Sequence, residues 1–225
     1  MATGILIIGE SGSGKTTSCR NLDPKTTYYC DLDGKGLSWR GWRSQYNIEH
    51  KNYTRNGDAK ALMKLLQGIS DTRPNIKVVV LDTLNAIMLA MEMEQRKTNT
   101  YSQWMDLAVN IYGILDMIGR LRDDLTVVCI AHSQTEQNDM GYCLTRMKTS
   151  GRKLDKIVPE SKFTTVFLAK GNEGKYIFET RANKSTAKTP MGLFDEPEID
   201  NDLVPIIARL REFEQGVTSC KNARI

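Results

Sequence analysis

The chain has 225 residues, of which 40% are hydrophobic and 26% are charged, as is ordinary for a globular protein. This length fits one well-filled core, so we expect a single domain over residues 1–217 and a disordered tail over residues 218–225. No apolar run approaches the roughly 20 residues that cross a bilayer, and the start lacks the features of a signal peptide. We therefore expect a cytoplasmic protein without a membrane partner. Two histidines and five cysteines argue against a His/Cys metal site and a disulfide framework.

The net charge of +4 is unevenly distributed along the chain. Residues 145–188 contain eleven Lys and Arg against four Asp and Glu, a net +7, so the rest of the chain carries −3. A basic stretch in a mildly acidic protein indicates either contact with a polyanion or a solvated basic face.

Apolar runs alternate with stretches of helical periodicity, which predicts an α/β fold with a mostly parallel central sheet flanked by helices. The glycines and Asn172 of residues 171–174 predict the turn of a C-terminal β-hairpin, and Asp58 is a candidate helix cap. We expect little regular structure over residues 93–101 and 135–163. In chain order the expected elements are a strand over 5–8, a helix over 15–21, a strand over 26–31, a helix over 58–69, a strand over 78–81, a helix over 101–122, strands over 126–131, 164–168 and 175–179, and a helix over 203–213.

The segment after the first strand matches the phosphate-binding loop pattern G-x-x-x-x-G-K-[ST] without a mismatch. Its glycines allow backbone N–H groups to face a phosphate, and the following helix adds its dipole. Lys15 is expected to reach the β- and γ-phosphates of ATP, and Thr16 to bind Mg²⁺. The expected nucleotide-binding residues are Gly9, Glu10, Ser11, Gly12, Ser13, Gly14, Lys15, Thr16 and Thr17.

Asp82 ends the buried strand over 78–81, on the side of the sheet where ligands bind. We expect it to hold Mg²⁺ through water and to accept a hydrogen bond from Thr16. The alternative is that Asp82 only caps the next helix. Because Thr83 follows Asp82, the adjacent pair of acids usual in AAA-type ATPases is absent.

The sequence Tyr-Cys-Asp-Leu-Asp-Gly over residues 29–34 resembles the Tyr-Ile-Asp-Thr-Glu-Gly stretch of RecA-like recombinases. The resemblance places Asp33 on the Glu that orients the attacking water, although Asp33 is one methylene shorter. Glu10 is the rival catalytic acid. Asp31 and Asp33 are also typical turn residues before Gly34.

His132 follows the strand over 126–131, where RecA-like proteins carry a polar sensor of the γ-phosphate. The resemblance assigns the sensor role to His132, and a structural histidine is the alternative. In RecA-like proteins the loop after the sensor touches single-stranded DNA, by basic side chains and a stacking ring such as Tyr142. Residues 93–101 are a candidate second DNA loop. The expected DNA-binding residues are Arg146, Lys148, Arg152, Lys153, Lys156 and Lys162.

Residues 179–185 resemble the Lys-x-Arg-x-Gly region of DnaB-type and KaiC-type ATPases, in which basic residues reach a neighbouring subunit's γ-phosphate. Arg181 and Lys184, with Lys188 behind them, are the candidates here, and the alternative is exposed charge at a strand end. The resemblance implies a homo-oligomeric ring or filament with ATP at the subunit boundary.

Overall, residues 3–213 resemble the small phage ATPases that consist of a RecA core and little else. The stretches 125–132, 188–194 and 199–203 fit that group, which is linked to single-strand annealing in recombination. The resemblance implies a RecA-like ATPase with ATP, Mg²⁺ and single-stranded DNA as ligands, and a single-strand-binding protein as a further partner. The alternatives are a P-loop kinase and a nucleotide-gated oligomeric scaffold without a DNA role.

Overall fold

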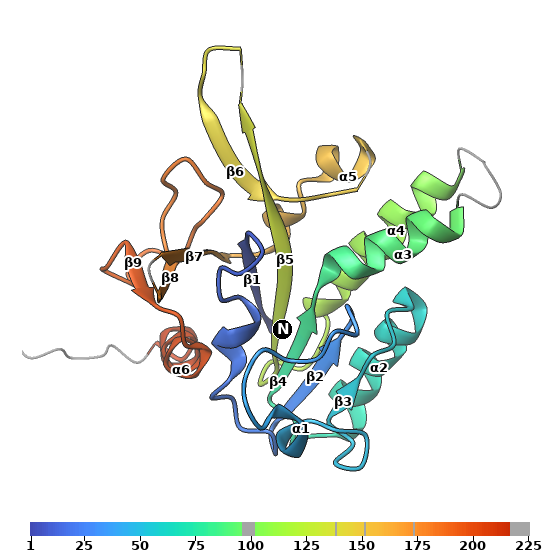
Figure 1. Cartoon of the computed structure of the whole chain (residues 1–225). Helices are drawn as coiled ribbons and strands as arrows, with labels where there is room; N and C mark the ends of the chain where they lie inside the picture. Colours follow the sequence, from blue (N-terminus) through green and yellow to red (C-terminus); the bar gives the residue numbers. More distant parts are fainter. Residues whose placement is uncertain (96–101, 138, 151, 173, 217–225) are drawn as a thin grey trace, which may run out of the picture.

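A mostly parallel sheet runs through the centre of the computed structural model, which describes residues 1–95, 102–137, 139–150, 152–172 and 174–216 (Figure 1). The strand order is β3-β2-β4-β5-β1-β7-β8-β9, and β6 pairs with β5 outside this path. The first six strands of the order are parallel, whereas β8, β9 and β6 are antiparallel to their partners. The strands are β1 (Thr3–Gly9), β2 (Thr27–Asp31), β3 (Tyr53–Thr54), β4 (Val78–Asp82), β5 (Thr126–Gln137), β6 (Cys143–Met147), β7 (Thr165–Asn172), β8 (Lys175–Glu179) and β9 (Glu198–Asp200).

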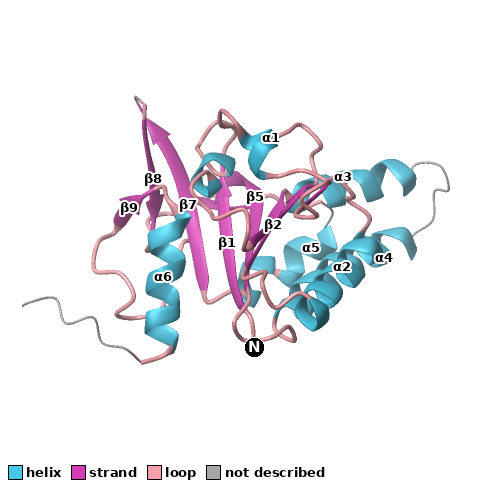
Figure 2. Cartoon of the chain, turned by 90° about the horizontal axis from the view of Figure 1, so that it is seen from below, coloured by secondary structure: helices cyan, strands magenta, loops and turns pink. Residues whose placement is uncertain are grey.

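Helices cover both faces of this sheet (Figure 2). One face carries α2 to α5, and the other carries the 3₁₀ helix η1 and α6. The predicted α/β class and flanked parallel sheet are therefore confirmed. The helices are α1 (Trp42–Gln45), α2 (Ala59–Thr72), α3 (Leu84–Gln95), α4 (Ser102–Ile118), α5 (Arg152–Ile157) and α6 (Leu203–Glu214), with 3₁₀ helices η1 (Thr16–Cys19) and η2 (Pro159–Lys162).

Strand β1 shows why the sheet is stable between two helical layers. Its side chains alternate, so Leu6 and Ile8 pack against the α2–α5 layer, while Ile5 and Ile7 pack against the η1 and α6 layer. All four are fully buried, as expected for a parallel strand covered on both faces. This burial fixes the register and brings Gly9, at the end of β1, to the carboxyl edge of the sheet.

The long amphipathic helices follow the sequence pattern closely. The predicted cap of α2 is confirmed, because the Asp58 carboxylate accepts a hydrogen bond from the Ala61 N–H at 2.7 Å. Helix α4 buries Ile111 and Leu115, as its predicted face requires. The last predicted helix is α6, and the predicted hairpin is formed by β7 and β8. The predicted tail over residues 218–225 lies outside the described residues.

The helix predicted over residues 15–21 is wrong in length and type. Only the four residues of η1 are helical, and they form a 3₁₀ helix. The Ser18 hydroxyl donates to the Lys15 carbonyl at 2.6 Å, and the turn at Asp23 and Pro24 follows soon after. Such side-chain bonds compete with α-helical ones. The dipole expected from an α-helix over residues 15–21 is therefore missing at the phosphate loop.

The expectation of little regular structure over residues 135–163 is also wrong. Strand β5 continues to Gln137 and pairs with β6 as an antiparallel hairpin, after which α5 and η2 follow. The hairpin projects beyond the rest of the sheet (Figure 1). Residues 93–95 belong to α3, whereas residues 96–101 lie outside the described residues. The sequence missed α3 because apolar residues occur all round this helix and weaken its periodicity.

Among the described residues, no helix combines the length and the apolar character that crossing a membrane would require.

Candidate functional site

The phosphate loop connects β1 to η1 at the carboxyl edge of the sheet, and its shape depends on glycine. Gly12 and Gly14 have φ values of 81° and 87°, which residues with a side chain rarely adopt. A Cβ atom on Gly9 would lie 2.5 Å from Ser13 Oγ and 2.8 Å from the Ala169 carbonyl oxygen. The loop therefore packs too tightly for a side chain at its first position.

Lys15 lies inside the curve of the loop. Its Nζ donates to the carbonyl oxygens of Gly9, at 2.9 Å, and Glu10, at 2.6 Å. The residue is only 6% exposed. Burial lowers the pKa of Lys15 from 10.5 to about 8, and the nearby Asp82 carboxylate opposes this effect. The side chain is thus an ammonium held on two carbonyl groups that a phosphate can replace.

Asp82, at the end of β4, is joined directly to the loop. Its Oδ2 atom accepts a hydrogen bond from Thr16 Oγ1 at 2.7 Å and another from the Tyr29 hydroxyl at 2.8 Å. The hydrogen bond predicted between Thr16 and Asp82 is therefore present. Burial raises the pKa of Asp82, and the bonds from Thr16 and Tyr29 counter the rise. Tyr29 was not singled out from the sequence, although it lies two residues before Asp31 on a buried strand.

The buried polar atoms at this site that lack a partner within the described chain include Asp82 Oδ1 and Ser13 Oγ. An unpaired buried oxygen costs free energy unless a ligand or water satisfies it. Mg²⁺ typically binds one or two protein oxygens and keeps several waters. The residues therefore fit a magnesium–nucleotide complex, with Thr16 and Asp82 on the metal side and Ser13 and Lys15 on the phosphate side.

Asp33 lies beside this group, whereas Asp31 has a structural environment. Asp31 is buried and accepts hydrogen bonds from the Tyr53 hydroxyl, at 2.6 Å, and the Gly36 N–H, at 2.9 Å. Asp33 Oδ1 accepts from Thr83 Oγ1 at 3.0 Å, and Asp33 Oδ2 pairs with Lys35 Nζ at 2.6 Å. Asp33 is thus held from two sides, by Lys35 in the loop after β2 and by Thr83 next to the end of β4.

Lys35 and Thr83 are site residues that the sequence analysis missed. Lys35 lowers the pKa of Lys15 as the second cation near it. Thr83 was read only as the absence of a second acid after Asp82, but its hydroxyl orients Asp33. By contrast, the rival acid Glu10 is exposed at the mouth of the loop.

His132 stands beside the loop because β5 pairs with β1. The register places His132 opposite Gly9. Burial lowers the pKa of His132, and the Lys15 charge lowers it further. Its backbone N–H donates to Asn85 Oδ1 at 2.7 Å. His132 was predicted to follow the end of a strand over residues 126–131. It lies instead within β5, the long strand that leads into the hairpin.

The predicted DNA-binding residues are spread over the hairpin and the segment after it. Arg146 lies 3.6 Å from Glu136 across the β5–β6 ladder, and Lys162 lies 3.2 Å from Asp116 of α4. These acids offset part of the local positive charge. Lys148 and Lys156 are exposed, Tyr142 is 55% exposed near the hairpin tip, and the side chains of Arg152 and Lys153 lie outside the described residues.

Arg181 and Lys184 are both exposed. Arg181 donates to the Phe194 carbonyl at 3.0 Å, and the Lys184 carbonyl accepts from the Thr145 N–H at 2.8 Å. Lys184 has a φ of 56°. The buried Glu179 holds this segment, because Ser185 and Lys170 both donate to its carboxylate. These hydrogen bonds of Arg181 and Lys184 join parts of the chain other than the phosphate loop.

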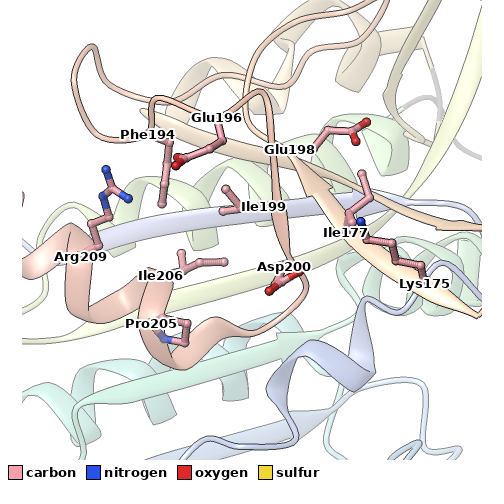
Figure 3. Close-up of a pocket in the computed structure, with 10 residues that line it drawn as sticks. All are labelled: Lys175, Ile177, Phe194, Glu196, Glu198, Ile199, Asp200, Pro205, Ile206 and Arg209. Carbon is pink, nitrogen blue, oxygen red and sulfur yellow. The ribbon is translucent and has the colours of Figure 1, made fainter.

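A separate groove lies between β8, β9 and α6 (Figure 3). It has a volume of about 450 Å³, an apolar floor and a rim with both acidic and basic side chains. None of the predicted site residues lines it. The lining residues are Lys175, Ile177, Phe194, Glu196, Glu198, Ile199, Asp200, Pro205, Ile206 and Arg209.

A family model described as an AAA domain matches residues 1–188. This range contains the phosphate loop, Asp33, Asp82, His132 and the β5–β6 hairpin. No curated protein matches the chain.

From the lowered pKa of Lys15 we predict that affinity for ATP depends on pH. Above pH 8 the buried amine is largely neutral in the protein without nucleotide, so binding a triphosphate must first restore its proton. Affinity for ATP should therefore fall as pH rises, by about tenfold between pH 7 and pH 9. Isothermal titration at pH 7, 8 and 9 measures this, with AMP, which lacks the β- and γ-phosphates, as the control ligand. Equal ATP affinity at pH 7 and pH 9 would contradict the assignment.

Proposed function

The chain belongs to the AAA domain family, and from this premise we propose that it is a RecA-like ATPase that binds single-stranded DNA and supports annealing in recombination. The family indicates nucleotide binding and ATPase activity. The observation that carries the proposal is the meeting of Lys15, Thr16, Asp82 and His132 at the edge from which the β5–β6 hairpin extends.

Each residue of the site has a distinct task in this proposal. Lys15 and the backbone N–H groups of the loop bind the phosphates, while Thr16 and Asp82 hold Mg²⁺. Mg²⁺ held by Thr16 and Asp82 would supply positive charge that offsets the charge of the phosphates. Asp33 accepts a proton from the attacking water, and Thr83 and Lys35 keep its carboxylate oriented. His132 offers a hydrogen bond at the γ-phosphate.

The hairpin supports the DNA part of the proposal. One arm of the hairpin is the continuation of β5, the strand that carries His132. A contact between His132 and the γ-phosphate would therefore act on the residues where the hairpin begins. The exposed side chains of Tyr142, Lys148 and Lys156 offer a stacking ring and two cations. This combination binds single strands with little preference for sequence.

Assembly and annealing extend the same proposal. Arg181 and Lys184 are exposed basic side chains available to a neighbouring subunit, and a cation supplied in trans stabilises the charge of phosphoryl transfer. The resemblance to the RecA-core-only phage ATPases supports a homo-oligomeric ring or filament and a single-strand-binding protein as partner.

A second candidate function is a nucleotide-gated scaffold without a DNA role. The ion pairs of Arg146 with Glu136 and of Lys162 with Asp116 favour it, because they reduce the positive charge that DNA would meet. Binding of single-stranded DNA separates the two candidates.

Changing Asp33→Asn should slow ATP hydrolysis by about a hundredfold while leaving ATP affinity within about twofold, because only water activation is lost. The matched control is Glu10→Gln, which removes one carboxylate charge at the exposed rival position. Turnover is measured by phosphate release, and affinity by titration. If Glu10→Gln abolishes turnover and Asp33→Asn does not, Glu10 is the catalytic acid.

Reversing the charges of Arg152 and Lys153 to Glu should weaken single-strand binding by at least about tenfold and spare ATP affinity. The slope of log affinity against log salt should also become shallower, because fewer counterions are released. Fluorescence anisotropy with a labelled oligonucleotide measures both quantities. The matched control reverses Lys60 and Lys64, two exposed residues of α2. Affinity and slope equal to those of the wild type would favour the scaffold function.

A further inference from the structure

The side chain of Asn85 sits where the hairpin leaves the sheet. Asn85 is in the first turn of α3, three residues after Asp82. Its Oδ1 accepts from the His132 N–H at 2.7 Å, and its Nδ2 donates to the Lys148 carbonyl at 2.8 Å. One amide therefore bonds the strand beside the phosphate loop and the residue that ends the hairpin.

The bonding pattern shows that this amide completes the last rung of the β5–β6 ladder. His132 and Lys148 face each other one step beyond the Ser133–Met147 pair. The Lys148 N–H donates directly to the His132 carbonyl at 2.7 Å. The reciprocal connection, from the His132 N–H to the Lys148 carbonyl, runs through Asn85 instead. The rung thus consists of one direct bond and one bridged by a side chain of α3.

The bridge requires an amide. Asparagine presents an acceptor and a donor from one planar group, which suits an N–H on one side and a carbonyl on the other. Aspartate has nearly the same shape but offers two acceptors, so it can hold His132 but repels the Lys148 carbonyl. Alanine satisfies neither group, which is costly where the group is partly buried.

The same short segment contacts each part of the nucleotide site. Asp82 accepts from Thr16, Thr83 donates to Asp33, and Asn85 bonds His132 and Lys148. Thr83 and Leu84 are buried, so this segment is firmly packed. Asp82 and Asn85 are only three residues apart, so a change of position at Asp82 can reach Asn85 through the buried Thr83 and Leu84.

We propose that Asn85 is a positioning residue that couples the nucleotide site to the β5–β6 hairpin, by closing the His132–Lys148 rung with its amide. This inference rests on the nucleotide binding of the proposed function, and it does not depend on DNA binding. Nucleotide binding shifts the rung, and the rung sets the order of the hairpin. The consequence is that the hairpin's stability depends on nucleotide only while the amide bridge is intact.

Hydrogen–deuterium exchange of peptides covering β6, with and without a non-hydrolysable ATP analogue, tests this coupling. In the wild type the analogue should change the exchange rate of β6 by at least about fivefold. In Asn85→Asp and Asn85→Ala the change should fall below about twofold, while affinity for the analogue stays within about twofold. Asn75→Asp, an exposed asparagine before β4, is the control with the same change of charge.

The inference is overturned if Asn85→Asp keeps the wild-type dependence of β6 exchange on nucleotide, or if the wild type binds the analogue and shows no dependence. It is also overturned, together with the proposed function, if the wild type binds no nucleotide. Single-strand binding is measured on the same samples. Absence of DNA binding alongside normal coupling in the wild type contradicts only the DNA part of the proposed function, and supports the role of Asn85.

Discussion

The buried carboxylate of Asp82 links the parts of this chain on which the nucleotide site depends. It accepts hydrogen bonds from Thr16 of the phosphate loop and from Tyr29 of β2. The next residue, Thr83, donates a hydrogen bond to Asp33. A carboxylate is stable at such depth only when hydrogen bonds and nearby cations compensate for lost hydration. The Oδ1 atom has no partner among the described residues, which leaves one position that a hydrated Mg²⁺ can satisfy. Thus the hydrogen bonds that hold Asp82 in place also orient the metal side of the site.

The long strand β5 connects the central sheet to the β5–β6 hairpin. The first part of β5 pairs with β1 and β4 in the central sheet. The last part pairs with β6 and forms one arm of the hairpin outside that sheet. His132 lies at the change between these two environments. A strand cannot shift in one part without disturbing the ladder in the other, because its register is set by burial. This continuity is a physical reason for nucleotide and hairpin to act on each other.

The sequence predicted the elements whose signals are local and repeated, and these include β1, β4, α2 and the phosphate loop. It failed where tertiary contacts decide the structure. Nothing in residues 135–163 alone indicates that Thr135 and Thr145 will pair, because β6 is stabilised by β5 rather than by its own periodicity. In the same way Lys35 and Thr83 became residues of the nucleotide site, and Asn85 a link between that site and the hairpin, only when the chain brought β2, β4 and β5 together. The α-helix expected over residues 15–21 is absent because the Ser18 hydroxyl bonds the backbone.

The loop around Lys15 is expected to bind the phosphates of a magnesium–nucleotide. Titration of ATP with Mg²⁺ into the wild type, Lys15→Ala and the control Lys25→Ala, whose lysine is on the surface turn before β2, tests it most directly. Lys15→Ala should bind at least about tenfold more weakly, because it removes the buried cation, and Lys25→Ala should match the wild type. Unchanged affinity in a folded Lys15→Ala protein would contradict the account.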